Sequence, residues 1–529
     1  MTRTPPTSTS PFAWGLLVLL LSILIGILIA SPLYINVDSG MYLEVGRYLL
    51  EGRTPYLDYV ELNPPLIHYI NVIPVAVAHW LNINPIIVYK ALVLMVLAYA
   101  MLVSRVLLRG SSIAGTLPLF MLFPIVMVFE TIADYADFGQ RDHLMALILI
   151  PWLLLRIERY HAPENKRSLA LTLLVGFLAA IAMALRPYFV LPLALVELYF
   201  LARYRTVKHI FRAETVIVIV SGIAYLAHFA LLPADARDVF FNQLIPFVQD
   251  NYESYSLYSG DSFWLLMNAR FIHLILIYGA SILLYLALPE DKRPPLLIPL
   301  FIFALGAYGV YLYQQLGFSY HAIPASLTVF LIFGTVLQAY WQILRDDTQL
   351  ALPKRAMRLL VATYAISGGL LILLMNLILP ALNTLPSDQA IVDLIEERTP
   401  EDASIFFVDS AMAPAFPLIT RINRQMDMTY VQGFPIAFSV YDQADPTAIY
   451  ADVPLPDDLQ RYVDALEGDI ARHQPDLVFI NSGACYGCPE EFQIYAWLEA
   501  SGFVASHLGD YTLLPNNTIE NFAIFEYND

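Results

Sequence analysis

The sequence predicts an α-helical polytopic membrane protein with about eleven transmembrane helices and a C-terminal soluble α/β domain. Of its 529 residues, 58% are hydrophobic and 14% are charged, whereas soluble domains carry about 25% charged residues. The charge is uneven: residues 382–529 hold 24 acidic and 5 basic residues, while residues 1–381 hold 22 and 24. Such a break marks a domain boundary. We therefore expect a transmembrane domain over 1–381 and an extracytoplasmic α/β domain over 382–529.

Eleven apolar stretches approach in length the roughly 30 Å hydrocarbon core of a bilayer. They lie at 12–34, 86–108, 113–133, 143–158, 169–186, 187–203, 215–233, 264–288, 296–314, 321–341 and 358–381. The first is longer than the about 7 to 15 residues of a signal-peptide core, which indicates an uncleaved anchor.

The orientation of the chain follows from a twelfth stretch, Pro65–Leu81, which is short and interrupted by polar residues. If it lies along the membrane surface and the N-terminus is cytoplasmic, the inside segments collect 17 Lys and Arg, and the outside loops hold five. This asymmetry satisfies the positive-inside rule, so we predict an interfacial helix. The outward segments are then 36–85, 134–142, 234–263, 314–320, the Arg186–Pro187 junction and the acidic C-terminal domain. For a bacterium this means a multi-pass protein of the cytoplasmic (inner) membrane.

The C-terminal region alternates strand-like and helix-like segments. Short apolar runs at 404–409, 476–481 and 522–527 suit buried strands, and 457–473 and 492–500 have the apolar spacing of helices. This order favours an α/β arrangement. The two cysteines of the chain, Cys485 and Cys488, form either a structural pair or a redox motif.

The first outward loop places a carboxylate, Asp38, directly after the first span. A polar loop of this length in a compact membrane protein is usually functional. Asp38 either performs acid–base chemistry on a lipid-borne substrate or caps a surface helix that begins at Ser39. The segment from Tyr42 to Glu51 has helical spacing, and we expect its charged residues to face water. These are Glu44, Arg47 and Glu51.

A second carboxylate, Asp142, stands at the start of a span on the same predicted face. The two carboxylates either share a substrate hydroxyl or a divalent cation, for which hard oxygen ligands favour Mg²⁺ or Mn²⁺, or Asp142 has a structural role. In the structural alternative it stabilises a helix N-terminus and pairs with Arg141 or Arg186.

The first-loop motifs resemble those of GT-C membrane glycosyltransferases, above all the protein mannosyltransferase-like and aminoarabinose transferase-like enzymes. The resemblance covers about residues 10–340. It rests on Asp38-Ser-Gly-Met-Tyr42, Gly52-Arg-Thr-Pro-Tyr56-Leu-Asp58 and Glu61-Leu-Asn-Pro-Pro65-Leu66, with a second acid at Asp142. The chain departs from the pattern at Ser39, where many relatives have a second acid, and at Asn63, where many have His or Lys.

The resemblance implies a donor in which a sugar is linked through phosphate to a polyprenyl lipid, with Asp38 as general base and Asp142 as the second catalytic acid. Arg186 is the leading ligand for the phosphate, because guanidinium binds phosphate bidentately. Lys90 and Arg270 are either further phosphate ligands or residues that snorkel to the interface. His321 either contacts the sugar or phosphate or is an interface residue. Glu61 and Tyr56 complete the predicted substrate-binding set.

Other functional classes remain open. The alternative is a polytopic transporter or lipid-linked-sugar flippase, although the sequence shows no internal repeat and its charges gather at one face. A third class is a receptor whose acidic C-terminal region binds a partner. No phosphate-binding glycine-rich loop occurs, which argues against ATP-driven work, and nothing indicates nucleic acid. No cofactor follows from the sequence besides the divalent cation, and the acceptor is a lipid, glycan or protein.

Overall fold

A computed structural model describes most of the chain. The described residues are 11–115, 117–251, 269–345, 353–375, 388–441, 445–450, 454–515, 519 and 521–528. Internal contacts divide the chain into two units. The first unit comprises Met1–Ser31, Leu92–Ala227 and Asp261–Thr384, and the second comprises Pro32–Ala91, His228–Gly260 and Leu385–Asp529.

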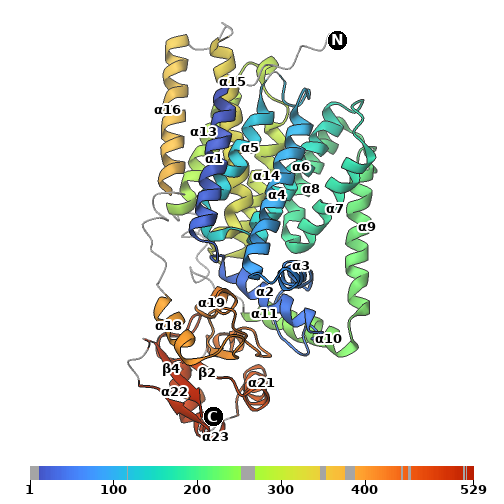
Figure 1. Cartoon of the computed structure of the whole chain (residues 1–529). Helices are drawn as coiled ribbons and strands as arrows, with labels where there is room; N and C mark the ends of the chain where they lie inside the picture. Colours follow the sequence, from blue (N-terminus) through green and yellow to red (C-terminus); the bar gives the residue numbers. More distant parts are fainter. Residues whose placement is uncertain are drawn as a thin grey trace. The chain divides into compact units, whose positions relative to one another are not determined.

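The first unit is a helical bundle, in which the helices run side by side (Figure 1). Its elements are α1 (Pro11–Ala30), most of α4 (Pro85–Leu108), α5 (Leu119–Ala133), η1 (Tyr135–Asp137), α6 (Arg141–His161), α7 (Leu169–Leu185), η2 (Pro187–Phe189), α8 (Val190–Tyr204), most of α9 (Ala213–His228), α13 (Ala269–Ala287), η6 (Glu290–Lys292), α14 (Leu297–Gln314), η7 (Ser319–Ala322), α15 (Ile323–Arg345) and α16 (Lys354–Leu373). Each of the eleven predicted spans overlaps one of these helices, although 264–268 and 376–381 lie outside the described residues.

The bundle has the composition of a multi-pass membrane protein. Within the described residues, six helices are long and apolar enough to cross a bilayer by themselves. Their outer faces carry large exposed hydrophobic side chains, such as Leu226 (70% exposed) on α9 and Leu359 (70%) on α16. Water-soluble proteins avoid continuous apolar surfaces of this kind. The exposed side chains therefore face lipid.

The second unit combines the first loop, the segment after α9 and the C-terminal region. Its elements are α2 (Val37–Leu50), α3 (Leu66–Leu81), η3 (Phe229–Leu231), α10 (Ala234–Asp238), η4 (Val239–Leu244), α11 (Ile245–Asn251), α18 (Gln389–Arg398), β1 (Ile405–Val408), α19 (Ala415–Arg421), α20 (Phe434–Val440), η9 (Pro446–Tyr450), α21 (Asp457–His473), β2 (Leu477–Asn481), α22 (Ile494–Ala500), α23 (Phe503–His507), β3 (Tyr511–Leu513) and β4 (Phe522–Tyr527).

The strands form one mixed sheet in the order β1-β2-β4-β3. β1 and β2 are parallel, with Ile405 opposite Leu477, and their connection contains α19, α20 and α21. β4 runs antiparallel to both β2 and β3. The three predicted strands and both predicted helices are present, and α21 has the predicted bounds. Cys485 and Cys488 form a disulfide within the connection that follows β2.

Helix α3 is amphipathic in the way that an interfacial helix requires. Ile67, His68 and Asn71 are buried, whereas Ile73 and Trp80 are exposed, Trp80 by 81%. An aromatic residue at the edge of an apolar face is typical of helices that lie in the headgroup region. This pattern fits the orientation that the sequence predicts for α3.

Helix α2 begins at Val37, two residues before the start at Ser39 that the capping alternative requires. The cap is Asn36, whose side chain accepts a hydrogen bond from the backbone N–H of Asp38 at 3.0 Å. The alternative in which Asp38 itself caps a helix starting at Ser39 is therefore wrong. Asp38 lies in the first turn, where its charge is stabilised by the helix dipole.

Two glycines of α2 allow close approach of neighbouring backbone. A Cβ at Gly46 would lie 2.7 Å from the carbonyl oxygen of Asn71 on α3, and one at Gly40 would lie 2.8 Å from Cα of Pro417 on α19. Real Cβ atoms do not approach other atoms this closely. The glycines thus bring α2 into direct contact with α3 and α19.

We expect Gly46→Ala to lower the unfolding free energy by about 1 to 3 kcal/mol, because the added methyl group forces α2 away from α3. The measurement is the thermal midpoint of the detergent-solubilised protein. Gly279→Ala is the matched control, since a Cβ at Gly279 on α13 would meet nothing within 4 Å. That control should be neutral or stabilising because alanine favours helix. Equal shifts in the two variants would contradict close packing at Gly46.

Candidate functional site

Arg186 and Asp142 form a buried ion pair in the first unit. Oδ2 of Asp142 accepts a hydrogen bond from Nε of Arg186 at 2.9 Å and lies 2.7 Å from its Nη2 as an ion pair. Asp142 is fully buried in the first turn of α6, and Arg186 is the residue that ends α7 before Pro187 begins η2. The pairing that the sequence leaves open between Arg141 and Arg186 is therefore made with Arg186. The carboxylate holds the guanidinium in one orientation.

Three of the predicted outward segments meet around this pair. Ser319 of η7 donates a hydrogen bond from its hydroxyl to Asp137 of η1 at 2.7 Å, which ties the α14–α15 connection to the α5–α6 connection. The ring of Tyr320 lies 5.9 Å from the guanidinium carbon of Arg186. These contacts gather a cation, carboxylates and hydroxyls at the ends of α5, α6, α7 and α14.

His321 lies beside this cluster with an unusual environment. It is 1% exposed and packs edge-on against the ring of Tyr320, with ring centres 4.6 Å apart. Neither ring nitrogen has a hydrogen-bond partner within the described part of the chain. A buried imidazole without a partner costs free energy. His321 is therefore suited to bind a polar group of a ligand.

The structure describes only one of the two further predicted phosphate ligands, Lys90 and Arg270, down to its side chain. Lys90 lies near the start of α4 and is only 5% exposed, so the interpretation that it snorkels out to the interface is wrong. Arg270 belongs to α13, but its side chain lies outside the described residues.

Asp38 is buried in the second unit, 5% exposed, in the first turn of α2. The neighbouring Ser39 shares a hydrogen bond between its Oγ and the hydroxyl of Tyr89 at 3.3 Å, which joins α2 to the start of α4. Because Asp38 belongs to one unit and Asp142 to the other, joint action of the two carboxylates stays a prediction.

Glu61, His68 and Tyr59 form a chain of hydrogen bonds inside the first loop. Oε2 of Glu61 accepts a hydrogen bond from Nε2 of His68 at 2.7 Å, and Nδ1 of His68 lies 3.2 Å from the hydroxyl of Tyr59. Asn63 donates to both oxygens of Glu61, and its carbonyl accepts a hydrogen bond from Tyr56 at 2.8 Å. Burial opposes ionisation of Glu61, but the hydrogen bonds from His68 and Asn63 outweigh it and lower its pKa. Glu61 thus remains charged and fixes the shape of the loop.

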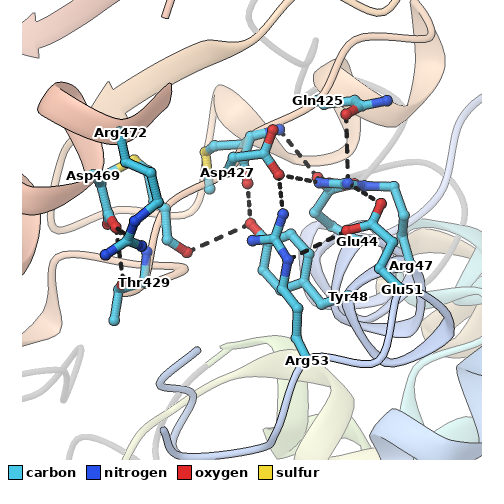
Figure 2. A network of polar contacts seen from close by, with 12 residues as sticks. Glu44, Arg47, Tyr48, Glu51, Arg53, Gln425, Asp427, Thr429, Asp469 and Arg472 are labelled. Atoms are coloured by element: carbon cyan, nitrogen blue, oxygen red, sulfur yellow. Dashed lines mark hydrogen bonds and ion pairs between the residues drawn. The ribbon is translucent and has the colours of Figure 1, made fainter. Parts of the chain in front are cut away.

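The expectation that Glu44, Arg47 and Glu51 face water is wrong for the first two. Glu44 is 3% exposed, and its Oε1 accepts hydrogen bonds from Arg47 and from the backbone N–H of Met426 at 3.0 Å. Arg47 also contacts Asp427 at 3.1 Å. Figure 2 shows these residues pointing toward one another, together with Tyr48 and Arg53. This face of α2 therefore packs on the C-terminal region rather than on water.

We call this set of residues the latch: Glu44, Arg47, Tyr48, Arg53 and Asp427. Arg53 forms an ion pair with Asp427, and the hydroxyl of Tyr48 donates to the carbonyl of Met426. Burial raises the pKa of Asp427, but the guanidinium groups of Arg47 and Arg53 outweigh it and hold the pKa below its usual value. Sequence reasoning missed the latch because its two halves lie 380 residues apart.

We expect Asp427→Asn to lower the unfolding free energy by about 3 kcal/mol, because it leaves two half-buried guanidinium groups without their carboxylate. Chemical unfolding of the purified protein measures the change. The matched control is Asp388→Asn, which breaks the more exposed, partly buried pair with Arg421 and should cost less than about 1 kcal/mol. If both variants lose the same amount, the latch is no stronger than a surface ion pair.

The residues present do not argue for a metal in the first unit. Among the described residues, no group of three or more His, Cys, Asp and Glu is arranged to hold a metal ion. The positive charge next to Asp142 comes from Arg186. A metal shared by Asp38 and Asp142 stays a prediction, and no step below uses one.

Comparisons with known proteins identify the fold. No protein-family model matches the chain, and no curated protein sequence matches it. Among solved structures, the crystal structure of ArnT from Cupriavidus metallidurans bound to undecaprenyl phosphate matches 98% of this chain and 98% of that chain. The TM-score is 0.56 and the sequence identity is 14%. The GT-C-like fold implied by the sequence resemblance is thus confirmed.

Proposed function

We propose that the protein is a membrane glycosyltransferase that moves a sugar from a polyprenyl-phosphate donor to a lipid, glycan or protein acceptor on the outer face of the membrane. The observation that carries the proposal is the buried Asp142–Arg186 pair, at the point where three polar connections of the bundle meet. The full-length match to a structure that holds undecaprenyl phosphate supports it.

Arg186 would bind the phosphate that leaves with the lipid. A guanidinium has five N–H donors in a fixed plane, so it can hold Asp142 and still donate to phosphate oxygens. The carboxylate sets the direction of this plane before the donor arrives, which reduces the cost of ordering the side chain. Lys90 and Arg270 are the proposed additional cations.

The other residues would bind the sugar or transfer the proton. The acceptor hydroxyl oxygen forms a bond to the anomeric carbon, the bond from that carbon to the phosphate oxygen breaks, and Asp38 takes the hydroxyl proton. A positioned general base contributes about 10² to 10⁴ to the rate. His321 is suited to a sugar hydroxyl or a phosphate oxygen, because its ring nitrogens are buried without a partner among the described residues. Glu61 and Tyr56 are the further proposed substrate-binding residues.

Two measurements test the proposal. Deleting the gene should remove one sugar mass from an envelope lipid, glycan or protein, as measured by mass spectrometry, and should raise the level of the lipid-linked donor. Envelope glycans that do not change would contradict the transferase. The purified protein in detergent should also release polyprenyl phosphate from that donor when acceptor is added. A flippase cannot do so, because it moves the donor without breaking the bond between the sugar and the phosphate.

A further inference from the structure

The second unit contains a cavity of about 330 Å³, and its lining includes Tyr56 but neither the proposed general base Asp38 nor the proposed phosphate ligand Arg186. Its size is at the small end of the range of ligand pockets, roughly 300 to 1,000 Å³. Three parts of the chain line it: the first loop, the η4–α11 segment and the C-terminal region around α20 and α21. We call it the groove.

One wall of the groove is aromatic and held in place. Tyr56 is 1% exposed, and its ring lies 4.7 Å from that of Phe240. The rings of Phe247 and Phe434 are 6.2 Å apart, and Tyr430 is 5.7 Å from Phe434. Rings with several fixed neighbours lose little conformational entropy when a ligand binds. The aromatic wall is therefore preorganised.

Part of the lining is a backbone link between the first loop and the C-terminal region. Val60 donates its N–H to the carbonyl of Thr429 at 2.6 Å, and Val431 donates to the carbonyl of Val60 at 3.4 Å. Asp469 accepts hydrogen bonds from the N–H and the hydroxyl of Thr429, at 2.6 and 2.8 Å, as Figure 2 shows. The first loop and α21 both hold this part of the lining in place, so the groove is a built feature of the fold.

The polar part of the lining, which we call the rim, carries more negative than positive charge. Asp458, Arg461 and Asp464 come from α21, and Gln243 comes from η4. Arg461 is paired with Asp458. The C-terminal region as a whole holds 24 acidic and 5 basic residues. A phosphate or other anion would be repelled here, whereas hydroxyl and ammonium groups can donate to the carboxylates.

We propose that the groove binds a neutral or cationic saccharide of the acceptor. A sugar ring has an apolar C–H face, which would pack on the aromatic wall, and hydroxyl groups, which would bond to the rim. The lipid-linked donor does not fit, because its phosphate would meet the acidic rim. The assignment of this saccharide to the acceptor rests on the proposed function, but the binding of a saccharide to the groove can be measured without any transfer.

Kinetics separate an acceptor site from a donor site. Asp464→Ala is expected to raise KM for the acceptor about tenfold or more, with unchanged KM for the donor and unchanged kcat at saturating acceptor. Asp393→Ala is the matched control. Both aspartates accept a hydrogen bond from a glutamine four residues earlier on an exposed helix face, Asp464 at 2.7 Å and Asp393 at 2.6 Å, but only Asp464 lines the groove. A raised KM for the donor would overturn the assignment, as would equal behaviour of the two variants.

Direct binding tests the groove even if the transferase proposal fails. Saturation-transfer NMR on the full chain would use N-acetylglucosamine, glucosamine and glucose 6-phosphate as probes. We expect signals from the first two and none from the phosphate. Ala465→Trp, which fills the groove, should remove the signals, and Asp464→Ala should weaken them, while Asp38→Asn should leave them. Signals that persist in both groove variants, or a stronger signal from the phosphate, would overturn the proposal.

Discussion

Replacing Asp38 by asparagine is expected to lower the transfer rate at least about 100-fold, because the acceptor hydroxyl would lose its general base. The same change should cost less than about 1 kcal/mol of stability. That is the size of a charge–dipole interaction at a helix N-terminus. The Asn36 cap bonds to the backbone N–H of Asp38, so it survives the substitution. A role as general base therefore predicts a large loss of rate with little loss of stability, whereas a purely structural role at the start of α2 predicts the reverse.

Asp58→Asn is the matched control for this experiment. Asp58 lies in the same loop but is exposed, and its carboxylate accepts a hydrogen bond from the N–H of Thr54 at 2.6 Å. Both variants should accumulate in the membrane at similar levels and unfold at similar temperatures, and only Asp38→Asn should stop polyprenyl phosphate release. Full activity of Asp38→Asn would remove Asp38 from the mechanism.

The sequence predicts the bundle well because each span must satisfy a local requirement. A helix in lipid has to be long and apolar by itself, so composition reveals it without knowledge of its neighbours. The convergence of 134–142, 314–320 and Arg186 also follows from local information, since these segments end spans on the same predicted face. The bond between Ser319 and Asp137 and the pair between Arg186 and Asp142 agree with that prediction.

The sequence fails where one pattern has two physical meanings. The charged face of α2 has the spacing of a face that meets water, but here it meets the C-terminal region, whose partner residue Asp427 comes 380 residues later. Nothing in the segment from Tyr42 to Glu51 distinguishes these cases. The two glycines of this helix, Gly40 and Gly46, are the sequence signal for a packed helix, because glycine disfavours a helix and is not needed on a face that meets water. In the structure both allow close approach of a neighbouring backbone.

Arg186 also has two possible roles: it binds the leaving phosphate, or it only neutralises the buried carboxylate of Asp142. Arg186→Gln would leave a buried carboxylate without its cation, which costs about 3 to 5 kcal/mol, so loss of activity in that variant has two explanations. The neutral double variant Arg186→Gln/Asp142→Asn removes the unpaired charge and should recover much of the stability. If Arg186 binds the leaving phosphate, transfer in the double variant should stay about 10² to 10³ below the wild-type rate, as when one donor to a developing anion is removed.

Two further variants assign this loss to one residue of the pair. Asp142→Asn keeps the guanidinium and frees it to move, so we expect a raised KM for the donor with part of kcat retained. Arg186→Lys keeps the charge but loses the bidentate geometry, and should bind the donor less tightly than wild type and better than Arg186→Gln. A neutral double variant with wild-type activity would reduce the pair to a structural role. The leaving phosphate would then need another cation, for which Lys90 is the first residue to test.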